Sequence, residues 1–587
     1  MPGVIYPSEV REKSLAWQSA QALSFSSRPL ITIFVHSSDP ETLNYQLESL
    51  AVQSWRNFKA VLLVEHDPKN IVLEDKYNFV TEIHELKSFG SKSWSNTLSD
   101  LCSPSSFRHL LFLGSDAIFH PEALFVLARE IVKTSPGAVY FNETISGLQG
   151  ENLSYLRKTA MGKYSFLTKN WFGQSFYVSG SLFEAALIEL RSSGEKDSLS
   201  SSKGMNWFSA SYAVCNTDVS FLPFALAARV KGQSLEDQCP HSDLDFLASW
   251  FASRNGLELE GLRVSDSGEI LPEPKKTLGS VQVIIPFKDQ SEKTAKALQS
   301  IAKQRRKDNL QILLVDNNSQ LEELASVQEA IRENSLNDYA TIVTDRGHFN
   351  YARLNNFAAS RSNSNFILLM NNDVELKGED DIERLKALCS FPEVGCVGAS
   401  LRYPDGGTQH SGINFAGVRP LNVTQESMFA NIFREVNGVS FALAMIRRDS
   451  WKSLDGLDEI NCPNGFGDAL FCHQLSSIGQ RVILDPGVSA VHHESVSRGI
   501  SVEDQELFDM SRSGLQVADQ FEQLEAKLQP VMISGLVESA PTPAFDAVIR
   551  KLKRSPALAS SIEVVSQVAV KSFKAVNTFR RSRERSS

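Results

Sequence analysis

Short apolar runs alternate along the chain with segments whose apolar residues recur every three or four positions, most clearly between residues 279 and 502. The recurring spacing predicts helices, and the continuous runs predict strands buried on both faces. Such strands, alternating with helices, are typical of an α/β fold with a parallel sheet covered on both sides. The expected strands are 281–287, 310–319, 340–343, 365–370 and 394–401, and the expected helices are 294–304, 321–333, 354–360 and 380–389.

The first part of the chain carries a fainter copy of this pattern. PLITIFV (29–35), FKAVLLVEHD (58–67) and HLLFLGSDAIF (109–119) resemble VQVIIPF, LQILLVDN and FILLMNNDVEL of the later block, in the same order. The repeat indicates an internal duplication of about 230 residues. We therefore predict an N-terminal extension (1–28), a first α/β domain (29–235), a connecting segment (236–278), a second α/β domain (279–510) and a helical tail (511–587). The connecting segment contains a helix (243–254), and the linker-like stretch 270–280 runs from it into the second domain.

Composition narrows the class of protein. A chain of 587 residues is too long for one core. Its 42% hydrophobic and 22% charged content is that of an ordinary soluble protein, and the net charge of −10 argues against nucleic-acid binding. The seven cysteines form no CxxC pair, which disfavours a disulfide framework or zinc knuckle and fits a reducing cytosol. With no signal-peptide pattern and no apolar stretch near the ~20 residues that span a bilayer, we expect a cytoplasmic protein.

The tail differs from the rest of the chain. Residues 544–587 hold ten Lys or Arg and three Asp or Glu, a net of +7, with apolar residues at roughly helical spacing. A basic amphipathic helix can lie on an anionic membrane surface. The tail is thus expected either to contact the inner face of the cytoplasmic membrane peripherally or to be a solvated end.

Carboxylates follow several of the expected strands in the later block. Asp289, Asp316 and Asp373 sit at or just past strand ends. In open parallel sheets, ligands bind at the carboxyl ends of the strands. The run LLMNNDVEL (368–376) shows the change from apolar strand to polar end most sharply, in Asn371, Asn372 and Asp373.

Six stretches together resemble the family 2 glycosyltransferases, which have a GT-A fold, and in particular the tandem two-domain enzymes that build bacterial surface polysaccharides, often rhamnosyltransferases. The resemblance covers roughly 29–499, weakly in the first half and strongly in the second. It implies two tandem GT-A-like domains with mostly parallel sheets, related to the Rossmann fold. The stretches are IIPFKD (284–289), VDNNS (315–319), FNYARLNNFAAS (349–360), LLMNNDVEL (368–376), VGCVGASLRYPDGGTQHSG (394–412) and HHESVSRG (492–499).

The resemblance implies an inverting, metal-dependent glycosyltransferase. Its donor would be a UDP- or dTDP-linked sugar, and its acceptor a hydroxyl of a growing surface glycan of the O-antigen or capsule kind, carried on a lipid. A divalent cation, Mn²⁺ or Mg²⁺, lowers the cost of charge on the leaving diphosphate. Asp373 is the expected direct ligand, because Asn371 stands where the Asp-x-Asp signature has its first acid. His492 would supply a further ligand, with His493 as the alternative if the register differs by one.

The remaining roles also follow from the resemblance. Asp468, in GFGDALFC (465–472), matches the general base that activates the acceptor hydroxyl. Leu470 replaces the second acid of that pattern. Arg498 could bind a phosphate through its planar guanidinium. The expected donor-binding residues are Pro286, Asp289, Asp316, Asn356, Asn371, Asn372 and Arg498.

Simpler roles exist for each of the three central residues. Asp373 could cap a strand end, Asp468 could be the N-cap of its helix, and His492 could pair with Glu494. If both domains lacked catalysis, the protein would be a glycan-assembly scaffold or a carbohydrate-binding protein, a reading favoured by Asn371 and Leu470. A nucleotidyltransferase is disfavoured, because neither copy has a Gly-rich basic loop after its first strand.

The first domain departs further from the family pattern. His36 replaces a strand-end proline, and Gly114-Ser115-Asp116 keeps only the last acid. Ala227 or a neighbour stands where a ligand histidine is expected. We therefore expect a domain that has lost catalysis and shapes the enzyme or its acceptor groove.

Overall fold

A computed structural model of the chain describes most of both predicted domains. The described residues are 27–86, 98, 107–145, 154–156, 158, 161–192, 199, 201–229, 241–265, 268–306, 309–416, 419–422 and 431–493. Arg498 and the basic tail therefore lie outside the described residues. Among the helices of the described part, none is long and apolar enough to cross a membrane.

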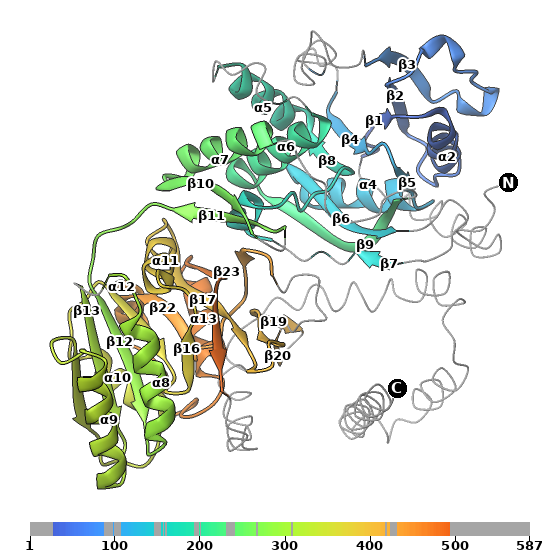
Figure 1. Ribbon diagram of the computed structural model, residues 1–587. Coiled ribbons are helices and arrows are strands. Elements are labelled where there is room, and N and C mark those ends of the chain that lie inside the picture. Colours follow the sequence, from blue (N-terminus) through green and yellow to red (C-terminus); the bar gives the residue numbers. More distant parts are fainter. Residues whose placement is uncertain are drawn as a thin grey trace, which may run out of the picture. The chain divides into compact units, whose positions relative to one another are not determined.

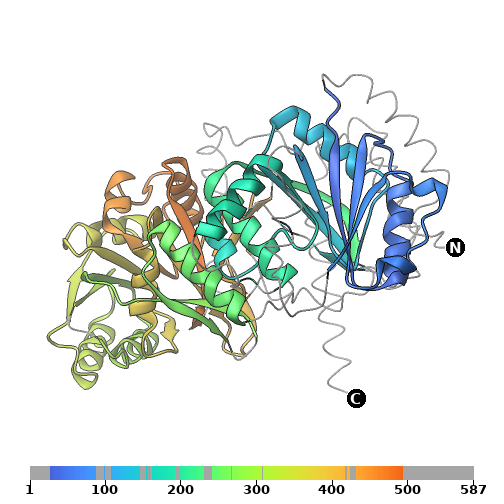
Figure 2. The same cartoon turned by 90° about the horizontal axis from the view of Figure 1, so that it is seen from above.

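Two large sheets follow the same strand order. Figure 1 labels most of their strands, and Figure 2 shows the same ribbon from above. Each sheet has six strands in one direction and the rest antiparallel to them. The first sheet runs β3 (Val80–Glu85), β2 (Phe58–Val64), β1 (Ile31–Ser37), β4 (His109–Leu113), β8 (Phe176–Ser179), β6 (Ala138–Ile145), β9 (Val219–Arg229) and β5 (Ala117–Phe119), with β7 (Ser154–Leu156) beside β6.

The second sheet repeats that path with its own strands. It runs β14 (Ala340–Thr344), β13 (Leu310–Asp316), β12 (Val281–Phe287), β15 (Phe366–Met370), β22 (Leu443–Arg447), β17 (Val394–Arg402), β23 (Arg481–His492) and β16 (Val374–Leu376), with β18 (Thr408–His410) beside β17 and β21 (Arg434–Glu435) beside β23. The predicted fold class, two α/β domains with mostly parallel sheets, is confirmed. The exact domain boundaries stay predictions.

Helices cover the sheets. The first domain contains α2 (Pro40–Ala51), α4 (Ala123–Thr134), α5 (Gly180–Ser192), α6 (Ser202–Asn216) and the short η1 (Pro68–Asn70), η2 (Asp75–Tyr77) and η3 (Lys163–Leu167); α7 (His241–Asn255) follows. The second contains α8 (Ser291–Ala302), α9 (Leu321–Glu333), α10 (Tyr351–Ala359), α11 (Asp381–Cys389), α12 (Arg448–Ser453) and α13 (Gly467–Ser477).

Alternate residues of the second sheet face two different helical layers. Val283 and Ile285 of β12 belong to a cluster that includes residues of α8, α9 and α11, whereas Ile284 belongs to one that includes residues of α10, α12 and α13. Every residue of β12 and β15 is buried. This two-sided burial is why the sequence shows continuous apolar runs rather than alternation.

The register of the two sheets makes their positions directly comparable. Ile31 pairs with Phe58 and His109, as Val281 pairs with Leu310 and Phe366. Counting along the strands from these pairs, Asp116 in the first domain corresponds to Asp373 in the second.

The region predicted as a linker contains secondary structure. Its first half, β11 (Ile270–Pro274), pairs with β10 (Leu259–Val264) in a separate two-stranded sheet. The first half of the predicted linker is thus a strand, and the linker assignment itself stays a prediction. Proline is tolerated there because the sheet has only edge strands. A second small sheet joins β19 (Ile413–Ala416) to β20 (Arg419–Asn422).

The segment η3 of the first domain contacts β21 of the second. The Tyr164 amide donates to Oε1 of Glu435 at 2.8 Å, and the Glu435 amide donates to Oγ of Ser165 at 2.9 Å. Arg481 donates to the other oxygen of Glu435 at 2.7 Å. The carboxylate of Glu435, which burial would otherwise destabilise, is thus held by groups from both domains.

Candidate functional site

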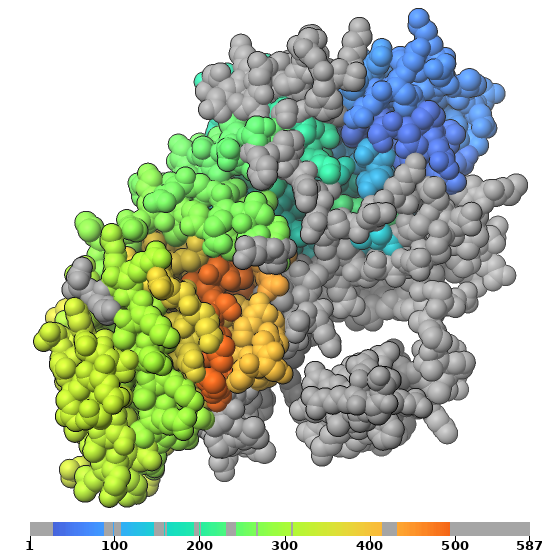
Figure 3. Space-filling view, in the orientation of Figure 1, coloured from blue at the N-terminus to red at the C-terminus, as the bar shows by residue number. Residues whose placement is uncertain are grey.

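The carboxyl ends of β12, β13, β15 and β23 meet at one edge of the second sheet, where β16 begins. Because β16 runs antiparallel to β23, Val374 pairs with His492. The side chains of Asp373 and His492 are brought together there, with His492 Nε2 3.3 Å from Asp373 Oδ1. Both side chains are mostly buried, with exposed fractions of 10% and 13% for Asp373 and His492. The orange-red strand β23 reaches the surface in the space-filling view (Figure 3).

Gln409, at the centre of β18, fixes which nitrogen of His492 faces Asp373. Its Oε1 lies 2.7 Å from His492 Nδ1, and its amide Nε2 donates to the His492 carbonyl at 3.4 Å. A carbonyl oxygen can only accept, so Nδ1 carries a proton. In the neutral imidazole, Nε2 then has a lone pair directed toward Asp373. This arrangement is the one that metal-ligating histidines use.

His493 points to a different partner. Its Nε2 lies 2.6 Å from Oε1 of Glu375, while its backbone amide donates to the Asp373 carbonyl at 2.9 Å. Successive side chains of an extended chain leave on opposite faces, so only one of the two histidines can face Asp373. The geometry favours His492, the first of the two sequence-based alternatives.

The Asp373 carboxyl is kept ionised by its surroundings. Burial raises the pKa of Asp373. When the imidazole is protonated on both nitrogens, however, its hydrogen bond and charge, together with the charge of Lys293, outweigh burial and leave the pKa of Asp373 below its usual value. The neighbouring Asn372 donates from Nδ2 to Oγ1 of Thr294 at 3.1 Å, and the Asn371 amide donates to the Ala442 carbonyl at 2.9 Å. The Asn371-Asn372-Asp373 turn is thereby tied to α8 on one side and to the start of β22 on the other.

Two carboxylates organise the ends of the neighbouring strands. Asp316 is buried at the end of β13 and accepts the Ser319 amide through Oδ1 at 2.9 Å. Asp289 accepts the Gln320 amide at 2.8 Å and has a left-handed backbone, with φ at +51°. Ser319 also accepts the Asp289 amide at 2.8 Å, a contact that the sequence did not suggest. Pro286 is in the buried β12 and pairs with Val315 of β13.

Asp468 lies in the first turn of α13. Phe466, with φ at +58°, occupies the N-cap position, so Asp468 is not the N-cap residue of this helix. Its Oδ1 accepts the amide of the adjacent Ala469 at 2.8 Å. Burial raises the pKa of Asp468, although backbone hydrogen bonds from Ala469 and Phe441 partly oppose this. A carboxylate with a raised pKa, next to the segment 440–442 that leads into β22, suits a general base.

Leu470 is buried among Ile413, Cys462 and Ala469. The position where the family pattern has a second acid therefore contributes to a small apolar cluster under α13. His410 is also buried and accepts the amides of Gly412 and Ser440 through Nε2, at 3.2 and 2.9 Å. Its role in the structure is to hold two loops together.

Asn356 is the sequence-predicted site residue whose surroundings differ most from expectation. Its amide group bonds to the backbone of Leu457 and to Glu459, both in the loop before α13. Asn356 was expected near the ribose and diphosphate, but its polar atoms are directed at this loop.

The first domain replaces several of these residues. By register, Val64 stands where the second domain has Asp316. Arg229 takes the position of His492, because Arg229 pairs with Ala117 in the first domain as His492 pairs with Val374 in the second. The histidine position was expected at Ala227 or a neighbour, and the register places it at Arg229, two residues after Ala227. Register shifts between β6 and β9, at Phe141, Asn142 and Glu143, explain why counting along the sequence failed.

Arg229 belongs to a buried cluster of charges. Its Nη2 lies 3.1 Å from Oε2 of Glu143, and Nζ of Lys158 lies 3.3 Å from the same oxygen. The Gly173 backbone covers the three side chains so closely that a Cβ there would be 3.0–3.2 Å from all of them. The edge that holds Asp373 and His492 in the second domain is therefore filled by ion pairs in the first.

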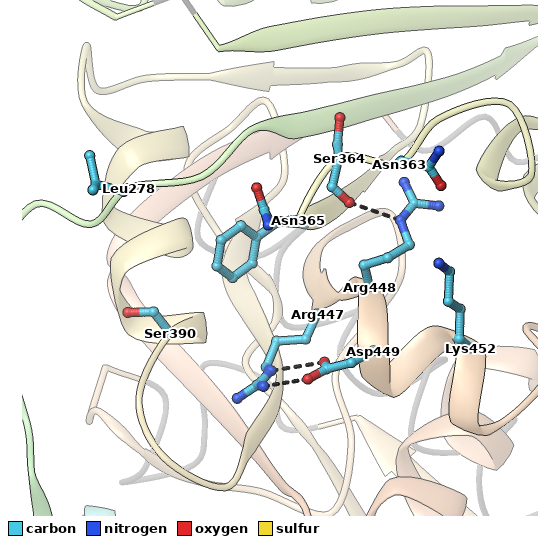
Figure 4. A pocket seen from close by; sticks show the side chains of 10 residues that line it. Leu278, Asn363, Ser364, Asn365, Ser390, Arg447, Arg448, Asp449 and Lys452 are labelled. Carbon is cyan, nitrogen blue, oxygen red and sulfur yellow. Dashed lines mark hydrogen bonds and ion pairs between the residues drawn. The ribbon is translucent and has the colours of Figure 1, made fainter.

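A cavity of about 450 Å³ opens at the opposite, amino-terminal edge of the second sheet (Figure 4). It is basic, but its arginines already have partners. Arg447 is paired with Asp449, and Arg448 donates to Ser364, Ala359 and Gln282. The cavity lacks the carboxylates and the histidine gathered at the other edge.

Part of the chain is similar to a known protein family. Residues 282–454 match the model of glycosyl transferase family 2. The O-antigen biosynthesis protein RfbC of Myxococcus xanthus is 31% identical over 236 residues, which is 38% of this chain and 18% of that protein. The uncharacterized protein y4gI of Sinorhizobium fredii (strain NBRC 101917 / NGR234) is 31% identical over 232 residues, 37% of this chain and 25% of that protein. The chain thus matches a quarter or less of the length of these relatives.

Solved structures overlap this chain only partly. GalNAc-T7 with UDP, GalNAc and Mn²⁺ gives a TM-score of 0.37 at 13% identity, over 46% of this chain and 54% of that one. TarS 1-349 of S. aureus in complex with UDP-GlcNAc gives a TM-score of 0.31 at 18% identity, over 43% of this chain and 73% of that one.

Proposed function

We propose that this chain, whose residues 282–454 form a glycosyl transferase family 2 domain, transfers a sugar from a nucleotide-diphospho-sugar to a hydroxyl of a glycan, with inversion at the anomeric carbon. The observation that carries the proposal is the pair Asp373 and His492 at the carboxyl edge of the sheet, with Gln409 holding the distal nitrogen of the imidazole. UDP and dTDP are the proposed carriers.

The donor atoms of this pair fit a divalent cation. Two ligands of one small ion, at metal–ligand distances near 2.1 Å and at right angles, lie about 3 Å apart. The separation of Nε2 and Oδ1 is 3.3 Å. Among the described residues no group of three or more His, Cys, Asp or Glu side chains could hold a metal, so further ligands would come from the diphosphate and water. A divalent cation, Mn²⁺ or Mg²⁺, would offset the negative charge that develops on the leaving diphosphate.

Asp468 is proposed as the general base. The acceptor hydroxyl gives its proton to the Asp468 carboxylate while its oxygen forms a bond to the anomeric carbon. The bond between that carbon and the diphosphate oxygen breaks, and a single displacement of this kind inverts the configuration. The raised pKa of Asp468 makes its carboxylate a stronger base than an exposed aspartate.

The donor would lie along the strand ends. We assign its nucleotide to the neighbourhood of Pro286, Asp289 and Asp316, and its diphosphate to Asn371 and Asn372. The backbone amides of Ser319 and Gln320 bond to Oδ1 of Asp316 and Asp289, so Oδ2 of each carboxylate is compatible with a contact to the donor. Arg498 stays a prediction.

The acceptor is proposed to be a growing surface glycan. The O-antigen biosynthesis protein that is 31% identical to this chain over 236 residues supports this class. A lipid carrier for the glycan and a peripheral contact of residues 511–587 with the cytoplasmic membrane are part of the proposal. A flotation assay with a chain truncated after Gly535 tests the contact, and unchanged membrane association would contradict it.

The first domain is proposed to be non-catalytic. Val64 and Arg229 stand where the second domain has Asp316 and His492. The ion-paired cluster of Glu143, Arg229 and Lys158 occupies the equivalent edge of the first sheet. Its contribution would be to shape the enzyme or its acceptor groove.

Thermal unfolding with nucleotide tests the site directly. We expect UDP or dTDP to raise the melting temperature in the presence of Mn²⁺ and to have much less effect in EDTA. A ligand at a hundred times its Kd stabilises a protein by about 2.7 kcal/mol. Asp373→Ala should lose the Mn²⁺-dependent part, and Asp116→Ala, its counterpart in the first domain, should keep it. If neither nucleotide stabilises the wild-type protein, the chain is a scaffold or carbohydrate-binding protein instead.

A further inference from the structure

The loop of residues 457–464, called here the α10 loop, caps the N-terminus of α10. The first amides of a helix have no partners within the helix and need acceptors from outside. The Tyr351 amide donates to Oδ1 of Asn464 at 3.2 Å, and the Ala352 amide donates to the Pro463 carbonyl at 3.0 Å. Asn350 accepts the Arg353 amide and donates from Nδ2 to the Glu459 carbonyl at 3.0 Å.

Asn356 holds the other end of this loop. Its Oδ1 accepts the Leu457 amide at 2.9 Å, and its Nδ2 donates to the Leu457 carbonyl and to Oε1 of Glu459, both at 2.8 Å. One side chain thus satisfies both backbone groups of Leu457. Gly456, with φ at +77°, lies so close that a Cβ there would be 2.3 Å from Asn356 Oδ1.

The loop leads directly into the helix that carries Asp468. Asp458 closes a turn by accepting the amides of Ile460 and Asn461, and its carbonyl accepts the Cys462 amide. Cys462 is buried against Ala469 and Leu470, the residues that follow Asp468. A displacement of the loop at Leu457 would therefore move the start of α13.

We infer that Asn356 is a positioning residue for the base Asp468 and not a ligand of the donor nucleotide, a role that rests on the function proposed above. Asn356 sets the place of the α10 loop, and the loop sets the place of the first turn of α13. The predicted contact of Asn356 with ribose and diphosphate is replaced by this role.

The distinction is measurable because the two roles affect different constants. A nucleotide ligand contributes to the affinity for UDP, whereas a residue that places the base contributes to kcat. Misplacing a catalytic group by about 1 Å can cost about a hundredfold in rate. We expect Asn356→Ala to lower kcat for donor hydrolysis by about ten- to a hundredfold and to change the Kd of UDP with Mn²⁺ by less than twofold.

Gly456→Ala disturbs the same contact from the side of the loop and leaves Asn356 in place. We expect it to lower kcat in the same way, again without changing the Kd of UDP. Ser360→Ala is the matched control, because Ser360 is the exposed C-cap residue of α10 and its hydroxyl donates to the Phe357 carbonyl of the same helix. It should leave both constants unchanged. Hydrogen exchange of residues 457–466 should speed up in Asn356→Ala and Gly456→Ala and not in Ser360→Ala.

Three outcomes would overturn the inference. One is a tenfold weaker Kd for UDP in Asn356→Ala with a normal kcat, which would make Asn356 a nucleotide ligand after all. Another is faster exchange of the loop in both variants with no loss of kcat, which would leave only a structural role. The third is a wild-type protein that hydrolyses no donor, in which case the proposed function itself fails.

Discussion

Replacing Gln409 with leucine should weaken metal binding without touching a metal ligand. Leucine is similar in size but cannot accept the proton of His492 Nδ1, which Gln409 Oε1 accepts at 2.7 Å. The imidazole would then lose the hydrogen bond that directs its Nε2 lone pair at Asp373. Partners of this kind typically contribute ten- to a hundredfold to metal affinity, about 1.4–2.8 kcal/mol. The weak 3.4 Å bond from Gln409 to the His492 carbonyl is lost as well.

The assay is a calorimetric titration of Mn²⁺ into protein saturated with UDP. We expect the Kd for Mn²⁺ to rise by ten- to a hundredfold in Gln409→Leu. His492→Ala should raise it further. Gln311→Leu is the control, because this exposed glutamine of β13 bonds to Ser362 and Ser364, away from the site. An unchanged Kd in Gln409→Leu beside a large loss in His492→Ala would refute the role given to Gln409, and an unchanged Kd in both would remove the metal from this edge.

Three further predictions concern Asp468, its neighbour Leu470, and the corresponding aspartates of the two domains. Donor hydrolysis should fall as the pH drops through the pKa of Asp468, because only the carboxylate can accept a proton. Burial raises this pKa above that of an exposed aspartate. A profile of kcat against pH measures it, and a fall in kcat only at the ordinary aspartate pKa would contradict the prediction. Leu470→Asp should lower the free energy of unfolding by at least about 3 kcal/mol, because it places a carboxyl in the apolar cluster with Ile413 and Cys462. Urea unfolding measures this, and a variant as stable as the wild type with higher activity would contradict it. Asp116→Ala should leave kcat within about twofold, whereas Asp373→Ala should lower it about a hundredfold or more; equal losses would mean that the first domain also works.

Much of the second sheet was predictable because its strands are buried on both sides. The strand expected at 281–287 and the helix expected at 321–333 coincide with β12 and α9. Helix α10 was expected from Leu354 but begins at Tyr351, since the acceptors that cap its first amides come from residues more than a hundred positions away. No local pattern in the sequence carries that information.

In the candidate site, too, local patterns predicted some features and contacts between distant residues decided the others. Asp373, His492 and Asp468 were predicted from local motifs, and the structure places Asp373 beside His492. The choice of His492 over His493 needed the pairing of β16 with β23. Gln409 lies in a stretch that the sequence analysis singled out, but nothing local shows that it faces His492, 83 residues later. Arg229 was missed because bulges between β6 and β9 shift the register.

The most direct test of the central claim is hydrolysis of a panel of UDP-, dTDP- and GDP-sugars with Mn²⁺ by the wild-type protein, Asp373→Ala and Asp468→Asn. We predict slow hydrolysis of one donor by the wild-type protein and its loss in both variants. That result would identify the sugar and locate the chemistry in the second domain. Turnover that survives in both variants would contradict the assignment of Asp373 and Asp468, and the absence of both turnover and nucleotide binding would contradict glycosyl transfer itself.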